Sequence, residues 1–412
     1  MKQTKRKGIT ALVGGLIVII LLLLGVAAYA FLYPPSSGST STSTKTVTAA
    51  QSSAIGKLKI GIVLPLTPSD NSWNYNAFNA ITQLQNEFNF TLSNSQNIAS
   101  STDAAVPAQQ WASQGYNVVI FMGGQYQQEA NTFGGQHPSM MSVCVDCTVA
   151  NYSNVYRIWL DLSGGGFVLG AMAGMVSQKH SFGLVGGGDI PSIWEGHEGF
   201  IAGVMYTSPV KPSITNTFEA FAWADVNGAQ STATNDYTGG ADVVFSSGDG
   251  VDVGVLGAAL AQPTSTQVWA SNVYTNLTAI NPADNRILLG SIVVDYYTPF
   301  FKALQQFVSS NWHWGYTKVD MASGLIAVQP GPNLPANVKA AGLALQNDIV
   351  EGSIIISFLS TSSGAPYCYV NTGQAYSSSC GDTTLTVPPG GGMPTGDMAA
   401  LFSYLPPVSS LA

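Results

Sequence analysis

The chain has 412 residues, a formal net charge of −8 and only 9% charged residues, against roughly one quarter in ordinary globular chains. This length allows two domains, and a hydrophobic content of 46% is ample for two cores. With 14 basic residues and no basic tract beyond the N-terminus, the composition argues against a nucleic-acid partner, and a pI near 4.8 suits an acidic exterior.

The N-terminal segment, residues 1–33, is predicted to be a membrane anchor or a signal segment. Four basic residues among the first seven precede an uncharged apolar run, Ile9 to Tyr33, which spans roughly 37 Å as a helix, enough to cross a bilayer. A retained anchor is favoured, because the run continues past the candidate signal-peptidase site Ala28-Tyr29-Ala30. Cleavage after Gly8, as in the archaeal pilin-like signal peptides that this stretch resembles, is a further alternative. The cationic flank is expected on the cytoplasmic side of the cell membrane, and the globular part outside the cell.

Residues 34–56 consist of Ser, Thr and Ala with little else. This composition cannot bury a core and predicts a flexible stalk. Three sequons, at Asn89, Asn151 and Asn276, are candidate glycosylation sites and are compatible with an exported chain.

Residues 59–83 predict a buried strand, a polar loop and a helix. The run Ile60–Leu64 is short and β-branched and ends at Pro65, which is typical of a parallel strand covered on both faces. The loop Leu66–Asn74 then places an acid, amides, hydroxyls and Trp73 at the carboxyl end of that strand, where open α/β sheets bind their ligands.

Further apolar runs alternate with helical patterns, which predicts parallel βαβ units and an α/β fold. The predicted strands are 117–122, 141–145, 155–160, 182–187, 216–221, 243–245, 268–270, 287–294, 324–328 and 354–357. The strand 155–160 is interpreted as crossing toward a second lobe, and 287–294 as returning to the first. Glycines between 164 and 174 lack the spacing of a nucleotide-binding fingerprint and indicate close helix packing instead.

The four cysteines form two near pairs. Cys144 and Cys147 predict a tight local disulfide or two buried thiols; a zinc site is disfavoured, because no second CxxC motif or nearby His follows. Cys368 and Cys380 flank a loop in the Pro-, Gly- and Ser-rich tail, residues 359–412, and outside the cell they are expected to staple it.

Several motifs occur in the order found in one family. Asp70, Ser72, Trp73 and Asn74 resemble the Asp-x-Ser-Phe-Asn loop of the basic membrane protein family, the PnrA-like substrate-binding proteins of ABC importers, with Trp73 in place of Phe. Residues 240–250 are similar to that family's Gly-Ala-Asp-Val-Val-Phe strand and glycine loop, and residues 190–204 to its Gly-Phe-x-x-Gly helix. The resemblance covers about residues 57–358.

The resemblance implies a type I periplasmic-binding-protein fold, in which two doubly wound parallel-sheet lobes are joined by a hinge. Residues 57–162 and 290–358 are then expected to form lobe 1, and residues 163–289 lobe 2. Such a protein binds by closing its lobes on a ligand, and two or three crossing segments serve as the hinge.

The same resemblance implies a ligand site on the facing loops. Trp73 is expected to stack on a flat ligand, with Trp194 or Trp223 across the cleft. Asp70, Asn74 and Asp225 are expected to orient it by hydrogen bonds, and backbone N–H groups of the glycine loop to complete the site. The candidate ligand-binding residues are Asp70, Ser72, Trp73, Asn74, Gly124, Trp194, Trp223, Asp225, Gly248, Asp249, Gly250 and Asn272.

By this resemblance the chain is an extracellular solute-binding protein that delivers a purine nucleoside or similar flat metabolite to an ABC importer. The implied partners are permease and ATPase subunits, with a monomeric chain and no cofactor or metal. The chain departs from nucleoside-binding members at the acid and the Lys that contact the sugar, where it has the Asn272 region and Val294. It also lacks the acylated Cys of bacterial members near its anchor.

Two other classes of function remain open. A membrane-anchored surface receptor or sensor that binds a small molecule without transport would use the same anchor, stalk and cleft. An enzyme is disfavoured, because the four histidines show no triad or metal spacing and neither a G-x-S-x-G motif nor a phosphate loop occurs.

Overall fold

A computed structural model describes residues 48–188, 190–218, 222–277, 285–309, 312–357 and 368–371. The predicted anchor, most of the stalk and Cys380 with nearly all of the tail lie outside these described residues. Within them, no helix is both long and apolar enough to cross a bilayer.

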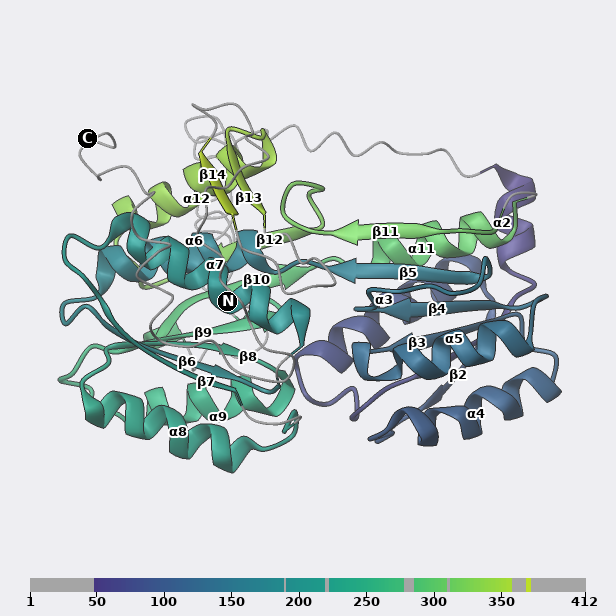
Figure 1. Ribbon diagram of the computed structural model, residues 1–412, viewed down its shortest axis with the longest axis horizontal. Coiled ribbons are helices and arrows are strands. Elements are labelled where there is room, and N and C mark those ends of the chain that lie inside the picture. Colours follow the sequence, from purple (N-terminus) through teal and green to yellow (C-terminus); the bar gives the residue numbers. More distant parts are fainter. Residues whose placement is uncertain are drawn as a thin grey trace, which may run out of the picture. The chain divides into compact units, whose positions relative to one another are not determined.

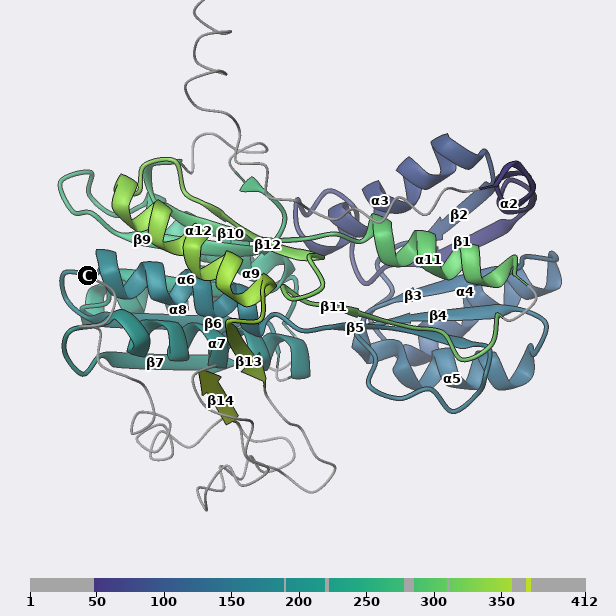
Figure 2. The same cartoon turned by 90° about the horizontal axis from the view of Figure 1, so that it is seen from above.

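The first lobe is built on a six-stranded sheet in the order β11-β5-β4-β3-β1-β2, in which every neighbouring pair is parallel. β1 lies between β3 and β2, so the strand order reverses there, and the helices cover both faces of the sheet (Figures 1 and 2). The strands are β1 (Lys59–Val63), β2 (Thr91–Ser95), β3 (Val118–Met122), β4 (Met141–Val145), β5 (Val155–Leu160) and β11 (Tyr316–Val319).

The helices of this lobe form two layers. α3 (Trp73–Phe88) and α11 (Tyr297–Phe307) cover one face, while α4 (Ser101–Ser113) and α5 (Gln127–Gln136) cover the other (Figure 2). A short 3-10 helix, η1 (Gly124–Tyr126), leads into α5. The core between the sheet and α4 and α5 is aromatic, with Trp111, Phe121, Tyr126 and Phe133 buried together.

The second lobe has the same plan, with a sheet in the order β12-β10-β9-β8-β6-β7. Only the edge strand β12 is antiparallel to its neighbour. The strands are β6 (Ser181–Gly186), β7 (Ser213–Phe218), β8 (Val243–Ser247), β9 (Trp269–Tyr274), β10 (Leu288–Val294) and β12 (Ile326–Pro330).

Helices again cover both faces of this sheet (Figure 1). α8 (Val226–Gly239) and α9 (Asp249–Leu260) lie on one face, and α6 (Ser163–Val176), α7 (Pro191–Thr207) and α12 (Ala336–Val350) on the other. After α12, the strand β13 (Ile354–Ser357) pairs in antiparallel fashion with β14 (Cys368–Asn371). The α/β fold predicted from the alternation of strands and helices is therefore confirmed, as are the two doubly wound sheets that the family resemblance implies.

The prediction that residues 287–294 return to the first lobe, and with it the boundary at 290, is wrong. β10 pairs with β9 and β12 and so belongs to the second sheet. Only α11 and β11 return to the first lobe, and β12 and α12 then lie on the second. Every residue of β10 is buried or nearly so, and a strand covered on both faces carries no sequence signal for which of two buried sheets it joins.

The predicted flexible stalk, residues 34–56, includes residues that form a helix. Residues 49–55 form the helix α2, whose start is stabilised by a capping box in which Thr48 and Gln51 exchange hydrogen bonds. Ile55 is fully buried and anchors this helix to the first lobe. The prediction failed there because Ser, Thr and Ala suit a capped helix as well as a stalk.

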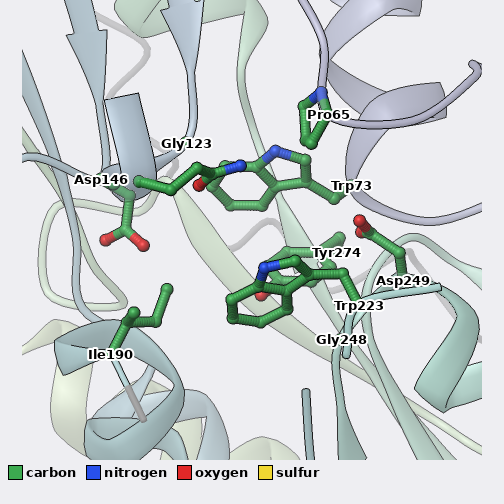
Figure 3. A pocket seen from close by; sticks show the side chains of 11 residues that line it. Pro65, Trp73, Gly123, Asp146, Ile190, Trp223, Gly248, Asp249 and Tyr274 are labelled. Atoms are coloured by element: carbon green, nitrogen blue, oxygen red, sulfur yellow. The ribbon is translucent and has the colours of Figure 1, made fainter. Parts of the chain in front are cut away.

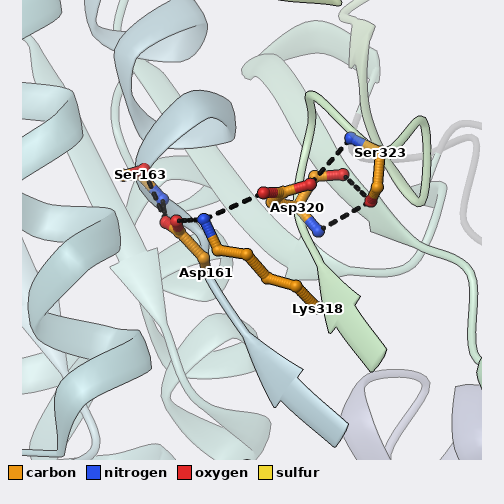
Figure 4. Close-up of polar contacts among 5 residues, drawn as sticks. All are labelled: Asp161, Ser163, Lys318, Asp320 and Ser323. Atoms are coloured by element: carbon orange, nitrogen blue, oxygen red, sulfur yellow. Dashed lines mark hydrogen bonds and ion pairs between the residues drawn. The ribbon is translucent and has the colours of Figure 1, made fainter. Parts of the chain in front are cut away.

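The chain crosses between the lobes three times, after β5, after β10 and after β11. Two of the crossings are tied together by charge, because Lys318 in β11 lies 2.8 Å from the Asp161 carboxylate after β5 and 2.9 Å from Asp320 (Figure 4). Asp161 also accepts hydrogen bonds from the backbone and hydroxyl of Ser163, at the start of α6. Lys318 therefore links the ends of β5 and β11, and Asp161 connects this ion pair to the start of α6.

Glycines bring α6 and α7 into unusually close contact. A Cβ atom on Gly166 or Gly170 would lie 2.1 or 2.0 Å from a carbonyl oxygen of α7, and one on Gly203 would lie 2.0 Å from a carbonyl oxygen of α6. Since no side chain fits in these distances, the glycines are explained by helix packing, as the sequence analysis predicted.

Replacing Gly170 by Ala is expected to destabilise the fold by at least about 2 kcal/mol, because its new methyl group must push the two helix backbones apart. Chemical denaturation measures this change. Gly239→Ala is the matched control: no atom lies within 4 Å of its Cβ position, so it should be neutral or slightly stabilising. Equal effects of the two substitutions would contradict the packing interpretation.

α7 carries carboxyl groups in the protein interior. Glu195 and Glu198 are 5% and 1% exposed, and neither oxygen of the Glu198 side chain has a hydrogen-bond partner among the described residues. Burial raises the pKa of Glu198 to about 8, and burial together with Asp161 and Asp146 raises that of Glu195 well above its usual range. These carboxyl groups are therefore protonated in the folded protein at acidic pH.

Stability is expected to fall as the pH rises from about 4.5 to about 8. In this range the unfolded chain has released the Glu198 proton while the folded protein still holds it, so raising the pH favours unfolding. Glu198→Gln should raise the free energy of unfolding at pH 8 by on the order of 2–4 kcal/mol, and with it the unfolding temperature. At pH 4 it should leave both unchanged. Thermal unfolding across this range tests the expectation, with the exposed Glu351→Gln as a control; equal gains at both pH values would refute it.

Candidate functional site

A cavity that is open to solvent lies between the two lobes. Every residue that lines it follows, or ends, a strand of one of the two sheets, as expected for ligand sites of doubly wound sheets. The first lobe contributes Pro65 and Trp73 after β1, Gly123, Gly124 and Gln125 after β3, and Asp146 after β4; the second contributes Ile190, Trp223, Gly248, Asp249 and Tyr274.

Aromatic rings form the walls of the cavity. The indoles of Trp73 and Trp223 lie on opposite sides of it, with Tyr274 behind them (Figure 3). Trp73 is held edge-on by Tyr274 and Tyr296, at ring-centroid distances of 4.9 and 5.4 Å, and its indole N–H donates to the carbonyl of Met122. This wall is therefore fixed in place by its neighbours.

Trp223 is half-buried and rests against Gly187, where a Cβ atom would lie 2.6 Å from the indole. The loop that carries it is fixed by the backbone N–H of Gly250, which donates to the Trp223 carbonyl at 2.6 Å. The first turn of α9 thus positions the second indole.

Asp249 begins α9 and is only 4% exposed. Its carboxylate accepts a hydrogen bond from the side-chain amide of Asn74 at 3.2 Å. Burial raises its pKa well above the usual range, and the neighbouring carboxylates of Asp70 and Asp252 raise it further. A site that takes up positive charge or hydrogen-bond donors would relieve this repulsion.

Asp146 is held by a covalent ring at the end of β4. Cys144 and Cys147 form a disulfide, which confirms the first of the two alternatives that the sequence left open. The ring brackets Asp146, whose backbone has a φ of 59°, in the left-handed region. Its carboxylate accepts from the Ser192 hydroxyl at 2.6 Å, and burial raises its pKa to about 7.

Hydrogen bonds between the lobes surround the cavity. Asn74 reaches Asp249, Ser72 reaches Asp252 at 3.4 Å, and Asp146 reaches Ser192. Further out, the Asn76 amide donates to the carbonyls of Tyr274 and Val294 at 2.6 and 2.7 Å, and Thr275 donates to Asn71 at 2.7 Å. Most of the first-lobe partners lie at the start of α3, so that this one turn carries the closed arrangement.

The structure brings five of the twelve residues predicted from the sequence to the cavity wall. They are Trp73, Gly124, Trp223, Gly248 and Asp249. The predicted pairing of Trp73 with an indole from the second lobe is met by Trp223, while Trp194 is buried in α7 and does not line the cavity.

Asp70 does not face the cavity. Its carboxylate accepts from the backbone N–H groups of Ser72, Asn74 and Tyr75 and from the Asn74 side chain, at 2.7 to 3.0 Å. It therefore caps the start of α3 instead of orienting a ligand, because the free N–H groups of a helix's first turn attract a carboxylate that lies next to them.

The remaining predicted residues have structural roles beside the cavity. Asp225 is exposed and caps α8 through the backbone N–H of Gly228. Asn272 is buried and accepts from the hydroxyl of Ser291. The residues Ser72, Asn74 and Gly250 support the wall through the contacts described above.

Six lining residues were missed by the sequence analysis: Pro65, Gly123, Gln125, Asp146, Ile190 and Tyr274. Asp146 carried a usable signal, since it sits inside the Cys-Val-Asp-Cys ring directly after a buried strand. Tyr274 is the last residue of β9, and its predicted strand, 268–270, stopped too early to place it at the carboxyl end.

The lining combines flat aromatic faces with carboxylate acceptors and backbone N–H groups. The described part of the chain places no histidine, cysteine thiol or serine hydroxyl among the lining residues.

Comparisons with known proteins agree with this architecture. The chain is 25% identical over 203 residues to the transcriptional activator protein med of Bacillus subtilis (strain 168), covering 49% of this chain and 62% of med, and 25% identical over 191 residues to basic membrane protein A of Borreliella afzelii, covering 45% and 57%. It thus spans less than two thirds of these relatives. The solved ABC transporter solute-binding protein of Aeropyrum pernix K1 has a similar fold, with a TM-score of 0.64 at 15% identity over 74% of this chain and 94% of that one.

A family model described as ABC transporter substrate-binding protein, PnrA-like, matches residues 57–357. This description is one of a binding protein and not of an enzyme. It agrees with the order of motifs in the sequence and with the cavity between two parallel-sheet lobes. The chain therefore belongs to the PnrA-like family of ABC transporter substrate-binding proteins.

Proposed function

We propose that this protein binds a small flat solute in the cavity between its lobes and delivers it to the permease and ATPase subunits of an ABC importer. The observation that carries the proposal is the pair of facing indoles, Trp73 and Trp223, supplied by opposite lobes (Figure 3). A ligand ring between them is contacted by both lobes only when the lobes are closed, so binding and closure are coupled.

A purine nucleoside or a similar flat metabolite has the shape that this arrangement takes. Its base would lie between the indoles, and its hydroxyl groups would donate to Asp146 or Asp249. Asn272 and Val294 stand where nucleoside-binding members carry an acid and a Lys, and Asp146 or Asp249 would supply an acceptor in place of that acid.

The sequence suggests how the protein would be attached to the cell surface. The apolar segment 9–33 would anchor the protein in the cell membrane with its lobes outside the cell, as a monomer, and residues 34–47 would form the stalk. Asn89 and Asn151 are exposed and suit glycosylation in such a location, whereas Asn276 is half-buried.

A second candidate function is a surface receptor or sensor without transport. It is favoured by the relative med of Bacillus subtilis, which is named as a transcriptional activator instead of a transport protein. A permease gene and an ATPase gene beside this one would support the importer, and a regulatory gene in their place would support the receptor.

Capture of a ligand tests the binding role directly. We expect the purified protein, exposed to a metabolite extract and examined by native mass spectrometry, to retain one small molecule at a one-to-one ratio. A captured ligand should also raise the unfolding temperature. A protein that retains nothing from extracts and shows no shift with nucleosides, bases or sugars would refute the proposal.

Trp223→Ala is expected to weaken binding of the captured ligand at least tenfold, because one of the two stacking faces is lost. Trp223 is a cleaner target than Trp73, which is 7% exposed and supports the core through Tyr274 and Tyr296, so its removal should also cost stability. Isothermal titration calorimetry measures the affinity.

The matched control is Trp314→Asn, which removes an indole that is 68% exposed and lies outside the cavity. Asn is chosen because the backbone of Trp314 is left-handed, with a φ of 59°, and Asn tolerates this conformation. The control should keep wild-type affinity. Wild-type affinity in Trp223→Ala as well would remove the indole pair from the site.

Asn76→Ala is expected to weaken binding about three- to tenfold without changing which ligand is preferred. It removes two hydrogen bonds between the lobes, each contributing about 1 kcal/mol or less, although the Asn76 side chain does not itself line the cavity. Asn79→Ala, on the exposed side of the same helix, serves as the control. Unchanged affinity in Asn76→Ala would show that closure does not contribute to binding.

A further inference from the structure

Among the described residues, two acids and no base line the cavity. Asp146 and Asp249 are the charged members of its eleven lining residues, and they lie at opposite ends of it (Figure 3). Within the described ranges the ion pairs are those of Lys318 with Asp161 and Asp320, so neither lining carboxylate is neutralised by a cation there.

More negative charge lies behind Asp249. Asp252 is one turn further along α9 and is 3% exposed, and Asp70 lies on the other side of the Asn74 amide. Polar groups such as Asn74, Ser72 and Ser192 donate hydrogen bonds to these carboxylates, but they carry no charge. Among the described residues, no positively charged side chain is therefore paired with the carboxyl groups around the cavity.

Buried carboxylates without a cationic partner are unfavourable. Burial raises the pKa of both lining carboxyl groups, which reflects this cost. A neutral ligand that donates hydroxyl groups would satisfy their oxygens yet leave the charge in place, whereas a positively charged ligand would offset it.

The aromatic walls point in the same direction. The faces of Trp73 and Trp223, together with Tyr274, attract a cation placed between them, and indole is the best of the aromatic side chains for this interaction. A bare metal ion fits less well, because nowhere in the described residues do three or more metal-ligating side chains converge.

We propose that the cavity selects a flat organic cation, such as an N-alkylated nitrogen heterocycle, whose ring lies between Trp73 and Trp223 and whose positive charge faces Asp146 and Asp249. This inference rests on the proposed function, since it specifies the ligand class of the same cavity. It adds the sign of the ligand's charge, which neither the fold nor the family determines.

Two pairs of compounds that differ in charge but hardly in shape provide the test. 1-Methylnicotinamide and nicotinamide form one pair, and 1-methyladenosine and adenosine the other; at pH 7.5 the first compound of each pair is a cation and the second is neutral. We expect calorimetry with the wild-type protein to show that at least one cation binds at least tenfold more tightly than its neutral counterpart.

The carboxylates are then removed without a change in shape. Asp146→Asn and Asp249→Asn should each weaken binding of the cation at least tenfold while leaving that of the neutral compound within about threefold. Asp225→Asn is the matched control, because this exposed acid lies outside the cavity and Asn caps a helix as well as Asp does. It should change neither affinity.

The outcomes separate this inference from the proposed function. If the neutral compounds bind as tightly as the cations, or if the Asn variants keep their affinity for the cation, the inference is overturned while the solute-binding role stands. Binding of none of the four compounds also overturns it, and the capture experiment with metabolite extracts then decides the proposed function alone. The comparison on the wild-type protein needs no substitution, so a variant that fails to fold leaves the test intact.

Discussion

The arrangement of the whole site depends on one carboxylate that does not touch the cavity. Asp70 gathers three backbone N–H groups and one side-chain amide, and this fixes the first turn of α3 against the end of β1. From that turn Trp73 projects into the cavity, while Asn74 and Asn76 reach the second lobe. A helix start that would otherwise fray becomes a rigid element that both forms a wall and joins the lobes.

The second lobe achieves the same result with glycine. Gly248 has a φ of 146°, a conformation closed to residues with a Cβ atom, and Gly250 lies against the backbone of Ala224. These two positions let the β8–α9 loop approach the loop that carries Trp223, so that Asp249 and the indole face the cavity together. A capped helix on one side and a glycine loop on the other therefore place two aromatic faces and two carboxylates around one space.

Much of this could be predicted from the sequence, because its signals are local. The strands that are apolar on both faces and the glycines of α6 each follow from spacing and residue type, and the spacing of Cys144 and Cys147 made a local disulfide one of two alternatives. The direction of a side chain does not. An acid before a helix can cap it or face a ligand, and only the tertiary structure shows that Asp70 and Asp225 cap helices whereas Asp249 lines the cavity. The same limit applies to β10, whose buried residues would suit either sheet.

The buried acids connect the cavity to the low charge of the chain. With 14 basic residues in 412, few cations are available to pair with carboxylates in the interior, and Lys318 already serves two acids at the crossing strands. Carboxyl groups such as Glu198 and Asp146 therefore remain without a cationic partner among the described residues, and burial raises the pKa of both toward neutrality. At acidic pH, protonation removes the unfavourable burial of an unpaired charge. This agrees with the acidic medium outside the cell that the composition suggests. At neutral pH the buried carboxyl groups of α7 cannot pair with a cation from solution, whereas a carboxyl group that lines the cavity can. This difference separates a structural carboxyl group from one that can recognise a ligand.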